Sequence, residues 1–303
     1  MRKAFCAAMV AEAGRPDLVF LTGDLGFMAL EPLRDALGSR FINAGVAEQN
    51  MVGVAAGLAR CSLRAWTYSI APFTYARPFE QIRNDVCLHA LPVVMVGNGG
   101  GYGYGVMGAT HHALEDYGAL LTLNSLHAYI PAFDSDVHAV VSRLMEIRHP
   151  AYLRLGLDEA PKDYVPPPYA AWRQIVHGSG ATILVCGPLI GGLITAIQQL
   201  PAAVRPSLWL VSELPVDAIP DAFLADMRRS THLMVVEEHV ANGGVGEQLA
   251  RKLLLLGAAP GRFSHRCATG YPSGRYGSQR FHRHECGIDA ASVLAALGLP
   301  ASP

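Results

Sequence analysis

The chain has 303 residues, and its 24 Lys and Arg against 25 Asp and Glu give a formal charge of −1. This balance excludes a strongly basic nucleic-acid-binding protein and argues against a polybasic membrane anchor. Charged residues make up only 16% of the chain, against about 25% in an average domain, so we expect a large core, some apolar surface and an oligomer. Six scattered cysteines without a Cys-x-x-Cys pair are typical of a reduced, cytoplasmic protein.

Two apolar stretches pose the question of secretion or membrane insertion. The first, residues 4–11 after a basic start, is short and is followed at once by Glu12 and two helix breakers, which favours an amphipathic first helix over a signal peptide. The second, residues 173–205, has no charged residue between its ends, but Gly187-Pro188 and Gly191-Gly192 interrupt it. We therefore expect a strand and a helix of a soluble domain there, and no transmembrane helix.

The first half of the chain alternates short apolar strands with helices. Strands that are buried on both faces of a sheet need no alternation of apolar and polar residues, and these show none. The pattern predicts an α/β domain with a mainly parallel sheet between helices. We expect strands at 18–22, 41–43, 65–68, 93–96, 127–130 and 151–155, and helices at 32–37, 48–60, 78–89 and 136–148.

A Pro-rich stretch from Pro161 to Pro168 is typical of an extended linker. The α/β pattern restarts after it, which predicts a second domain of the same class. Domain boundaries are expected at 1–160 and 172–303, with 161–171 as the linker. The second domain is expected to have strands at 182–186, 208–212 and 233–236, and helices at 190–200, 218–228, 245–256 and 290–297.

The most informative stretch is FINAGVAEQNMVGVAAGLA, residues 41–59. A strand ends, Gly45 turns the chain and Glu48 opens a helix. An acidic residue at this place is ordinarily a solvated carboxylate that the helix dipole favours. However, the small residues between Gly53 and Ala59 allow another backbone to approach closely, so we expect Glu48 to be buried at a helix contact. Burial raises the proton affinity of a carboxylate and makes Glu48 a functional candidate.

This stretch resembles the pyrimidine-binding domain of transketolases, in which the Glu of an Ile-Asn-x-Gly-x-Ala-Glu-Gln-Asn motif serves thiamine diphosphate. Other segments agree with the same family in the same order, over nearly the whole chain. The resemblance implies a pyrimidine-binding domain followed by a transketolase C-terminal domain. These segments are LTGDL at 21–25, SIAPFTYAR at 69–77, EQIRND at 80–85, GATHHALED at 108–116, VVEEH at 235–239 and GGVGE at 243–247.

The resemblance assigns roles to five residues around the cofactor. It implies that Glu48 is catalytic and hydrogen-bonds N1′ of the pyrimidine, which activates the cofactor. Phe73 and Tyr75 would pack on the pyrimidine ring and help to keep water out. Asp24 would lie near the thiazolium ring, and Arg77 would order the cofactor loop.

On the substrate side, the resemblance implies that His111 exchanges protons with the substrate. Without the resemblance, His111 would ordinarily be interpreted as a core or surface histidine. Met107 and Asn98 stand where transketolases usually carry an Asp and a His that recognise the sugar. A thioether is a poor hydrogen-bond acceptor, so we expect a less polar sugar and a specialised, biosynthetic ketol transfer. Arg154 either binds substrate phosphate, as in related deoxyxylulose-phosphate synthases, or pairs with a carboxylate.

The Gly-Asp-Gly…Asn motif that holds diphosphate and metal in this family is absent. The resemblance therefore implies a separate subunit with the diphosphate-binding domain, an α2β2 assembly, and Mg²⁺ or Ca²⁺ held by the partner. We expect no metal ligand in this chain, because residues 282–286, in a helix expected to be exposed, match no standard zinc spacing. The implied activity is transfer of a two-carbon ketol unit from a ketose to an aldehyde or aldose.

Two other classes remain open. One is a β subunit of a 2-oxo acid dehydrogenase or a decarboxylating enzyme of the deoxyxylulose-phosphate synthase type, which would release carbon dioxide from pyruvate. The other is a non-catalytic regulatory subunit with the same fold. Loss of the motif's glutamate would indicate the latter, and Glu48 is present.

Overall fold

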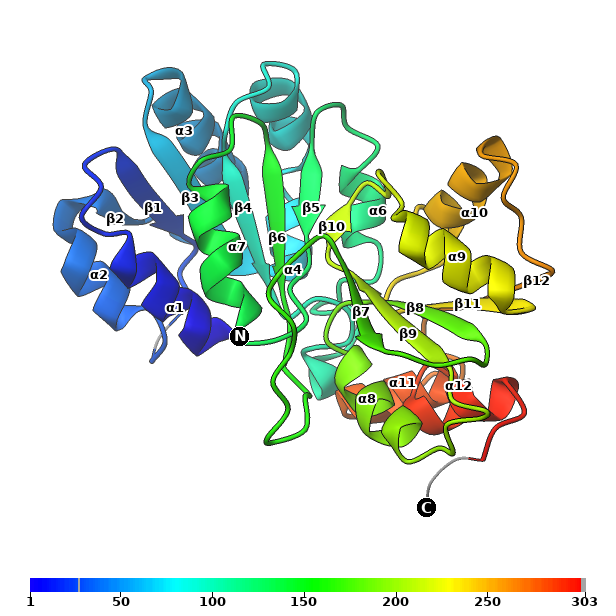
Figure 1. Cartoon of the computed structure of the whole chain (residues 1–303). Coiled ribbons are helices and arrows are strands. Elements are labelled where there is room, and N and C mark those ends of the chain that lie inside the picture. Colours follow the sequence, from blue (N-terminus) through cyan, green and yellow to red (C-terminus); the bar gives the residue numbers. More distant parts are fainter. Residues whose placement is uncertain (27, 301–303) are drawn as a thin grey trace.

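Seven strands form a first sheet in the order β10-β5-β6-β4-β3-β1-β2 (Figure 1). The computed structural model describes residues 1–26 and 28–300. All neighbours in this sheet run parallel except β10, which pairs antiparallel with β5. The strands are β1 (Leu18–Thr22), β2 (Phe41–Asn43), β3 (Arg64–Ile70), β4 (Val94–Asn98), β5 (His127–Tyr129), β6 (Ala151–Leu155) and β10 (Glu213–Leu214).

Helices cover both faces of this sheet, which explains why its central strands are apolar along their length. One face packs against α1, α2 and α7, and the other against α3 and the segments η2 and α6. The helical segments of this half are α1 (Arg2–Ala11), α2 (Glu31–Leu37), η1 (Gly38–Arg40), α3 (Glu48–Arg60), α4 (Ala71–Tyr75), α5 (Phe79–Gln81), η2 (Ile82–Cys87), η3 (Gly105–Met107), α6 (Asp116–Leu120) and α7 (Asp136–Leu144).

Five strands form a second sheet in the order β12-β11-β8-β9-β7, in which β7 alone of the described strands runs antiparallel. Its apolar residues pack with α8 and α12 on one face and with α9 and α10 on the other. The elements are β7 (Trp172–Val176), β8 (Thr182–Cys186), β9 (Ser207–Val211), β11 (His232–Glu237), β12 (Arg262–Arg266), α8 (Ile190–Gln198), α9 (Asp221–Arg229), α10 (Val245–Leu255), α11 (Gln279–Glu285) and α12 (Ala290–Ala296).

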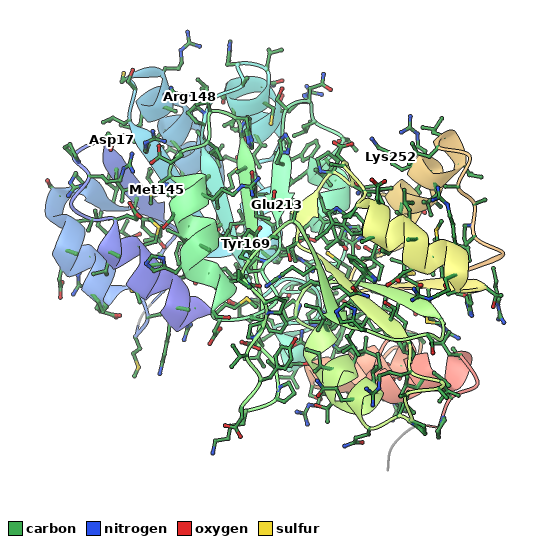
Figure 2. The ribbon with its side chains drawn as sticks, in the orientation of Figure 1. Asp17, Met145, Arg148, Tyr169, Glu213 and Lys252 are labelled. Atoms are coloured by element: carbon green, nitrogen blue, oxygen red, sulfur yellow. The ribbon has the colours of Figure 1, made fainter. Side chains whose placement is uncertain are left out.

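The two halves share one apolar core and one strand. Glu213 and Leu214 return from the second half to pair with Tyr129 and Ala128 at the edge of the first sheet. Glu213 also forms an ion pair with Arg143 of α7 at 2.9 Å, and Figure 2 shows it between the two halves. The division at 1–160 and 172–303 stays a prediction, because part of the second half completes the first sheet.

A buried ion pair crosses the same junction. Arg173 of β7 donates to both carboxylate oxygens of Asp136, at 2.6 and 2.7 Å. Asp136 begins α7 and also accepts the backbone N–H groups of Ala132 and Phe133. Four hydrogen bonds compensate for removing this carboxylate from water, so the pair fixes the start of α7 against the second sheet.

Some elements differ from the prediction. The helix expected at 78–89 is a short turn at Phe79–Gln81 followed by a wider π-helix at Ile82–Cys87. The strands β7 and β12 and the short β10 were not predicted. β7 and β12 lie at sheet edges and are only partly buried, so they carry no continuous apolar run.

Neither apolar stretch forms a membrane span. Within residues 1–26 and 28–300, no helix is both long and apolar enough to cross a bilayer. Residues 173–205 contain β8 and α8, as expected. The first helix, α1, is amphipathic and buries Phe5 and Met9 in the core between the first sheet and α7.

The Arg173–Asp136 pair gives a stability prediction. We expect Arg173→Met to lower the free energy of unfolding by about 3–5 kcal/mol, because Asp136 would stay buried without its countercharge. The exposed pair between Lys252 and Asp217 supplies the control, and Lys252→Met should change stability by less than about 1 kcal/mol. Urea unfolding of both variants measures the difference, and equal midpoints would contradict the prediction.

Candidate active site

Four strands of the first sheet end at one edge, and polar side chains gather just beyond them. Asp24 follows β1, Asn43 ends β2, Ser69 lies near the end of β3 and Asn98 ends β4. Glu48 opens α3 at the same edge, within 3.5 Å of the Ser69 hydroxyl. Open α/β sheets bind their ligands in the crevice outside the carboxyl ends of the strands. The most specific sequence motif therefore lies where this fold places a ligand.

Glu48 is buried, as predicted, with 5% of its side chain exposed. Gly45 turns the chain into α3 with a φ of +71°, a conformation that glycine adopts without strain. Oε1 of Glu48 accepts a hydrogen bond from Nη1 of Arg77 at 2.7 Å. Oε2 receives no hydrogen bond from the part of the chain that the structure describes, and Glu48 lines a surface hollow of about 620 Å³. One carboxylate oxygen is therefore available to a ligand.

Arg77 connects Glu48 to the aromatic side chains of the site. Its guanidinium carbon lies 3.7 Å from the centroid of the Phe73 ring, which is a cation–π contact. The Phe73 ring in turn meets the edge of the His111 ring, with 5.4 Å between centroids. Nδ1 of His111 lies 2.9 Å from the Thr110 hydroxyl. The fold thus brings four of the predicted site residues into one continuous cluster.

Two other residues predicted to bind the cofactor contact different neighbours. Asp24 is exposed, accepts a hydrogen bond from Asn43 at 3.0 Å and lines a second hollow of about 490 Å³. The Tyr75 hydroxyl donates to Oε2 of Glu115 at 3.2 Å. Burial raises the pKa of Tyr75, so its hydroxyl stays protonated near neutral pH. Contact of Asp24 and Tyr75 with a cofactor stays a prediction.

The Gly-rich loop, residues 99–108, contains Met107 and lies between Asn98 and His111, three of the residues predicted to face the substrate. Asn98 precedes it and donates from Nδ2 to the Tyr104 hydroxyl at 2.9 Å. The Tyr104 ring lies 5.9 Å from the ring of His111. Met107 is 56% exposed at the end of the loop. Tyr104 was not singled out from the sequence, and an aromatic residue between glycines was the one signal for it.

Arg154 lies inside the protein, in β6. Its Nε donates to Asp116 at 2.7 Å, and its Nη2 donates to the carbonyl oxygens of Ala113 and Glu238 at 2.9 and 3.0 Å. Of the two roles that the sequence left open, the pairing with a carboxylate is present in the structure. The binding of a substrate phosphate stays a prediction.

The segment 282–286 is exposed only in part, at His284, which corrects the expectation. His282 and Arg283 are buried where α11 packs against the Gly-rich loop. The His282 ring stacks on Tyr102 with 4.8 Å between centroids, and His112 meets Tyr102 edge-on at 5.2 Å. Burial lowers the pKa of both histidines, so they are neutral near neutral pH.

The cluster around Glu48 fits the pyrimidine half of thiamine diphosphate. It offers an available carboxylate oxygen, the Phe73 ring and an open hollow. Among the described residues, no group of three or more His, Cys, Asp or Glu side chains could hold a metal ion.

Residues 1–161 match the family described as transketolase, pyrimidine binding domain. The match covers more than half of the chain, and the chain belongs to the transketolase family. The predicted family and the predicted α/β fold with two mainly parallel sheets are confirmed.

Two curated relatives that match over most of their length are named as transketolase subunits. The chain is 28% identical to a subunit of the apulose-4-phosphate transketolase of Actinobacillus succinogenes, over 92% of this chain and 90% of that protein. It is 29% identical to the protein of the same name from Phocaeicola vulgatus, over 81% and 80%. It is also 30% identical to the 1-deoxy-D-xylulose-5-phosphate synthase of Myxococcus xanthus, over 97% of this chain but 50% of that enzyme.

Solved structures agree with this assignment. A structure described as a split gene transketolase in an inactive β4 tetramer superposes with a TM-score of 0.84 at 27% identity, over 98% of this chain and 96% of that one. The transketolase of Leishmania mexicana has the same fold, with a TM-score of 0.75 over 97% of this chain and 44% of that one. The predicted class, a transketolase-like transferase subunit, is confirmed.

Proposed function

We propose that this chain is the pyrimidine-binding subunit of a split, thiamine diphosphate-dependent transketolase that moves a two-carbon ketol unit from a ketose to an aldehyde. The observation that carries the proposal is the buried Glu48, which lines a surface hollow and has one oxygen held by Arg77 while the other accepts no hydrogen bond among the described residues. A cytoplasmic location fits this proposal, because the six cysteines are all unpaired.

Glu48 would hydrogen-bond N1′ of the pyrimidine. Because Arg77 engages Oε1, this contact would be made by Oε2. Bound thiamine diphosphate supplies a carbanion equivalent next to the substrate carbonyl, which amino-acid side chains cannot provide. Phe73 offers an apolar ring beside Glu48 and His111, and it would orient the ligand and exclude water.

The Glu48→Gln variant tests this role. Gln keeps the shape and can hydrogen-bond, but it cannot share a proton with N1′. We expect assembly to persist, while deuterium exchange at C2 of the bound cofactor falls by about 100-fold or more, since a proton-transfer group is lost. The exposed Glu80 gives the matched control, Glu80→Gln. Unchanged exchange in Glu48→Gln would show that Glu48 only opens the helix.

The diphosphate-binding half would come from a partner subunit, in an α2β2 assembly. The names of the relatives, a transketolase subunit and a split gene transketolase, support this. The small residues of α3 lie partly on an open face rather than at an internal helix contact. A Cβ added at Gly53 or Gly57 would meet no atom within 4 Å, and the adjacent Val46 and Val54 are 75% and 40% exposed. This apolar face beside Glu48 suits another protein chain.

The partner proposal predicts that the single chain binds thiamine diphosphate and Mg²⁺ weakly in calorimetry. It also predicts that Gly53→Arg blocks association with a chain that carries the Gly-Asp-Gly…Asn motif. The variant should fold normally, because Arg has the higher helix propensity. Gly14→Arg is the control, since Gly14 has equally open surroundings. Tight, metal-dependent binding by the single chain would contradict the proposal.

The substrate would be a less polar sugar than the donor of the pentose-phosphate reaction. Met107 is exposed near the end of the Gly-rich loop. Its thioether is polarizable and is a weak hydrogen-bond acceptor. The relatives named for apulose 4-phosphate act on a sugar other than that standard donor, which supports a specialised reaction here.

We therefore expect the assembled enzyme to use xylulose 5-phosphate and ribose 5-phosphate poorly. Met107→Asp restores a hydrogen-bond acceptor and should raise kcat/KM for this pair by about tenfold. Its neighbour Val106 is also exposed, and Val106→Asp should have no such effect. Ordinary transketolase efficiency in the unmodified enzyme would contradict the proposal, and carbon dioxide release from pyruvate would indicate the decarboxylating alternative.

A further inference from the structure

Glu238 reaches from the second half of the chain to the backbone of the Gly-rich loop. It directly follows β11 and is 5% exposed. Its Oε1 accepts the backbone N–H of Tyr102 at 2.6 Å, and its Oε2 accepts Nε of Arg283 at 2.7 Å. Gln279 donates to the same carboxylate at 2.9 Å. This carboxylate therefore fixes the backbone of Tyr102, in the middle of the loop that contains Met107 and precedes His111.

The loop approaches Glu238 so closely that only glycine fits. A Cβ at Gly101 would lie 2.6 Å from the Glu238 side chain, and a Cβ at Gly100 would lie 2.3 Å from Nε of Arg154. Gly101 also has a φ of +64°. Glycine-rich backbone loses more conformational entropy on ordering than other backbone, so a loop of this composition needs strong anchors to hold one conformation.

The residues around Tyr102 complete the anchor. The Tyr102 ring is fully buried against His282, and its hydroxyl donates to the carbonyl of Gly270 at 2.6 Å. Nη1 of Arg283 bonds Glu159 at 2.6 Å. Because the carboxylate of Glu238 is buried with a positive partner, displacing it would leave a charge unpaired, so the anchor resists movement.

We propose that Glu238 is a positioning residue for the ketol transfer: it fixes the Gly-rich loop, and through it the placement of Met107 and His111 toward the substrate. This inference rests on the proposed function. Glu238 acts through the backbone of Tyr102 and leaves the cofactor side of the site, at Glu48, untouched. Loss of the anchor therefore weakens substrate binding while cofactor binding persists.

Two variants and one control test the anchor. Glu238→Gln removes the charge, and Gly101→Ala pushes the loop away from an intact Glu238. Gly257→Ala is the control, because Gly257 has a φ of +63° but no atom near its added Cβ. Hydrogen exchange at the amides of residues 99–108 in the purified chain, and the KM and kcat of the assembled enzyme, are the measurements.

We expect both loop variants to raise exchange at the Tyr102 amide about tenfold, as for the loss of a hydrogen bond to a charged group. KM for the ketose should rise about tenfold and kcat should fall, because His111 is displaced as well as Met107, while cofactor affinity stays within about twofold. Lower thermal stability with unchanged loop exchange and KM would show a merely structural role and overturn the proposal. If Glu238→Gln does not fold, Gly101→Ala decides by the same criteria.

The experiment separates this proposal from the proposed function. Hydrogen exchange at the loop amides can be measured without turnover. If the variants leave the protection of these amides unchanged, the proposed anchoring role of Glu238 is wrong, even if the enzyme is active. Absence of ketol transfer in the unmodified complex would contradict the proposed function, and with it the catalytic part of this inference.

Discussion

Two consecutive buried carboxylates, Glu237 and Glu238, fix the two halves of the chain against each other. Glu237 accepts the backbone N–H groups of Val245 and Gly246 at the start of α10, a hydrogen bond from His265, and one from Tyr117 of the first half. Although burial opposes ionisation, the bond with His265 holds the pKa of Glu237 below its usual range. A buried charge is tolerated only when its partners are in place, so this junction permits one arrangement of the two sheets.

The Gly-rich loop depends on that arrangement, and the cluster of Glu48, Arg77 and Phe73 does not. Glu48, Arg77 and Phe73 all come from elements of the first half, at the carboxyl ends of its strands. The Gly-rich loop also belongs to the first half, but Glu238 and His282 of the second half hold it in place. Contacts with the second half therefore set the conformation of the loop, while the cluster around Glu48 rests on contacts within the first half.

The sequence predicted the fold and the burial of Glu48 well, because both rest on local signals. Buried parallel strands read as continuous apolar runs, and Glu48 lies in a specific motif that sets the end of β2 and the start of α3. The pairing of Arg77 with Glu48 joins residues 29 positions apart, and the hydrogen bond from the Tyr102 N–H to Glu238 spans 136 positions. Such long-range contacts carry no periodicity, which is why Glu238 was missed and segment 282–286 was expected to be exposed.

The ion pair with Arg77 also explains how the chain keeps a buried acid beside an open hollow. An isolated carboxylate at 5% exposure would lose much of its hydration without compensation. The guanidinium supplies that compensation at Oε1, and because it is itself 42% exposed and lies on the Phe73 ring, it reaches Glu48 from the solvent side. The carboxylate is therefore held in place by this chain's own side chains, while Oε2 accepts no hydrogen bond from the described residues.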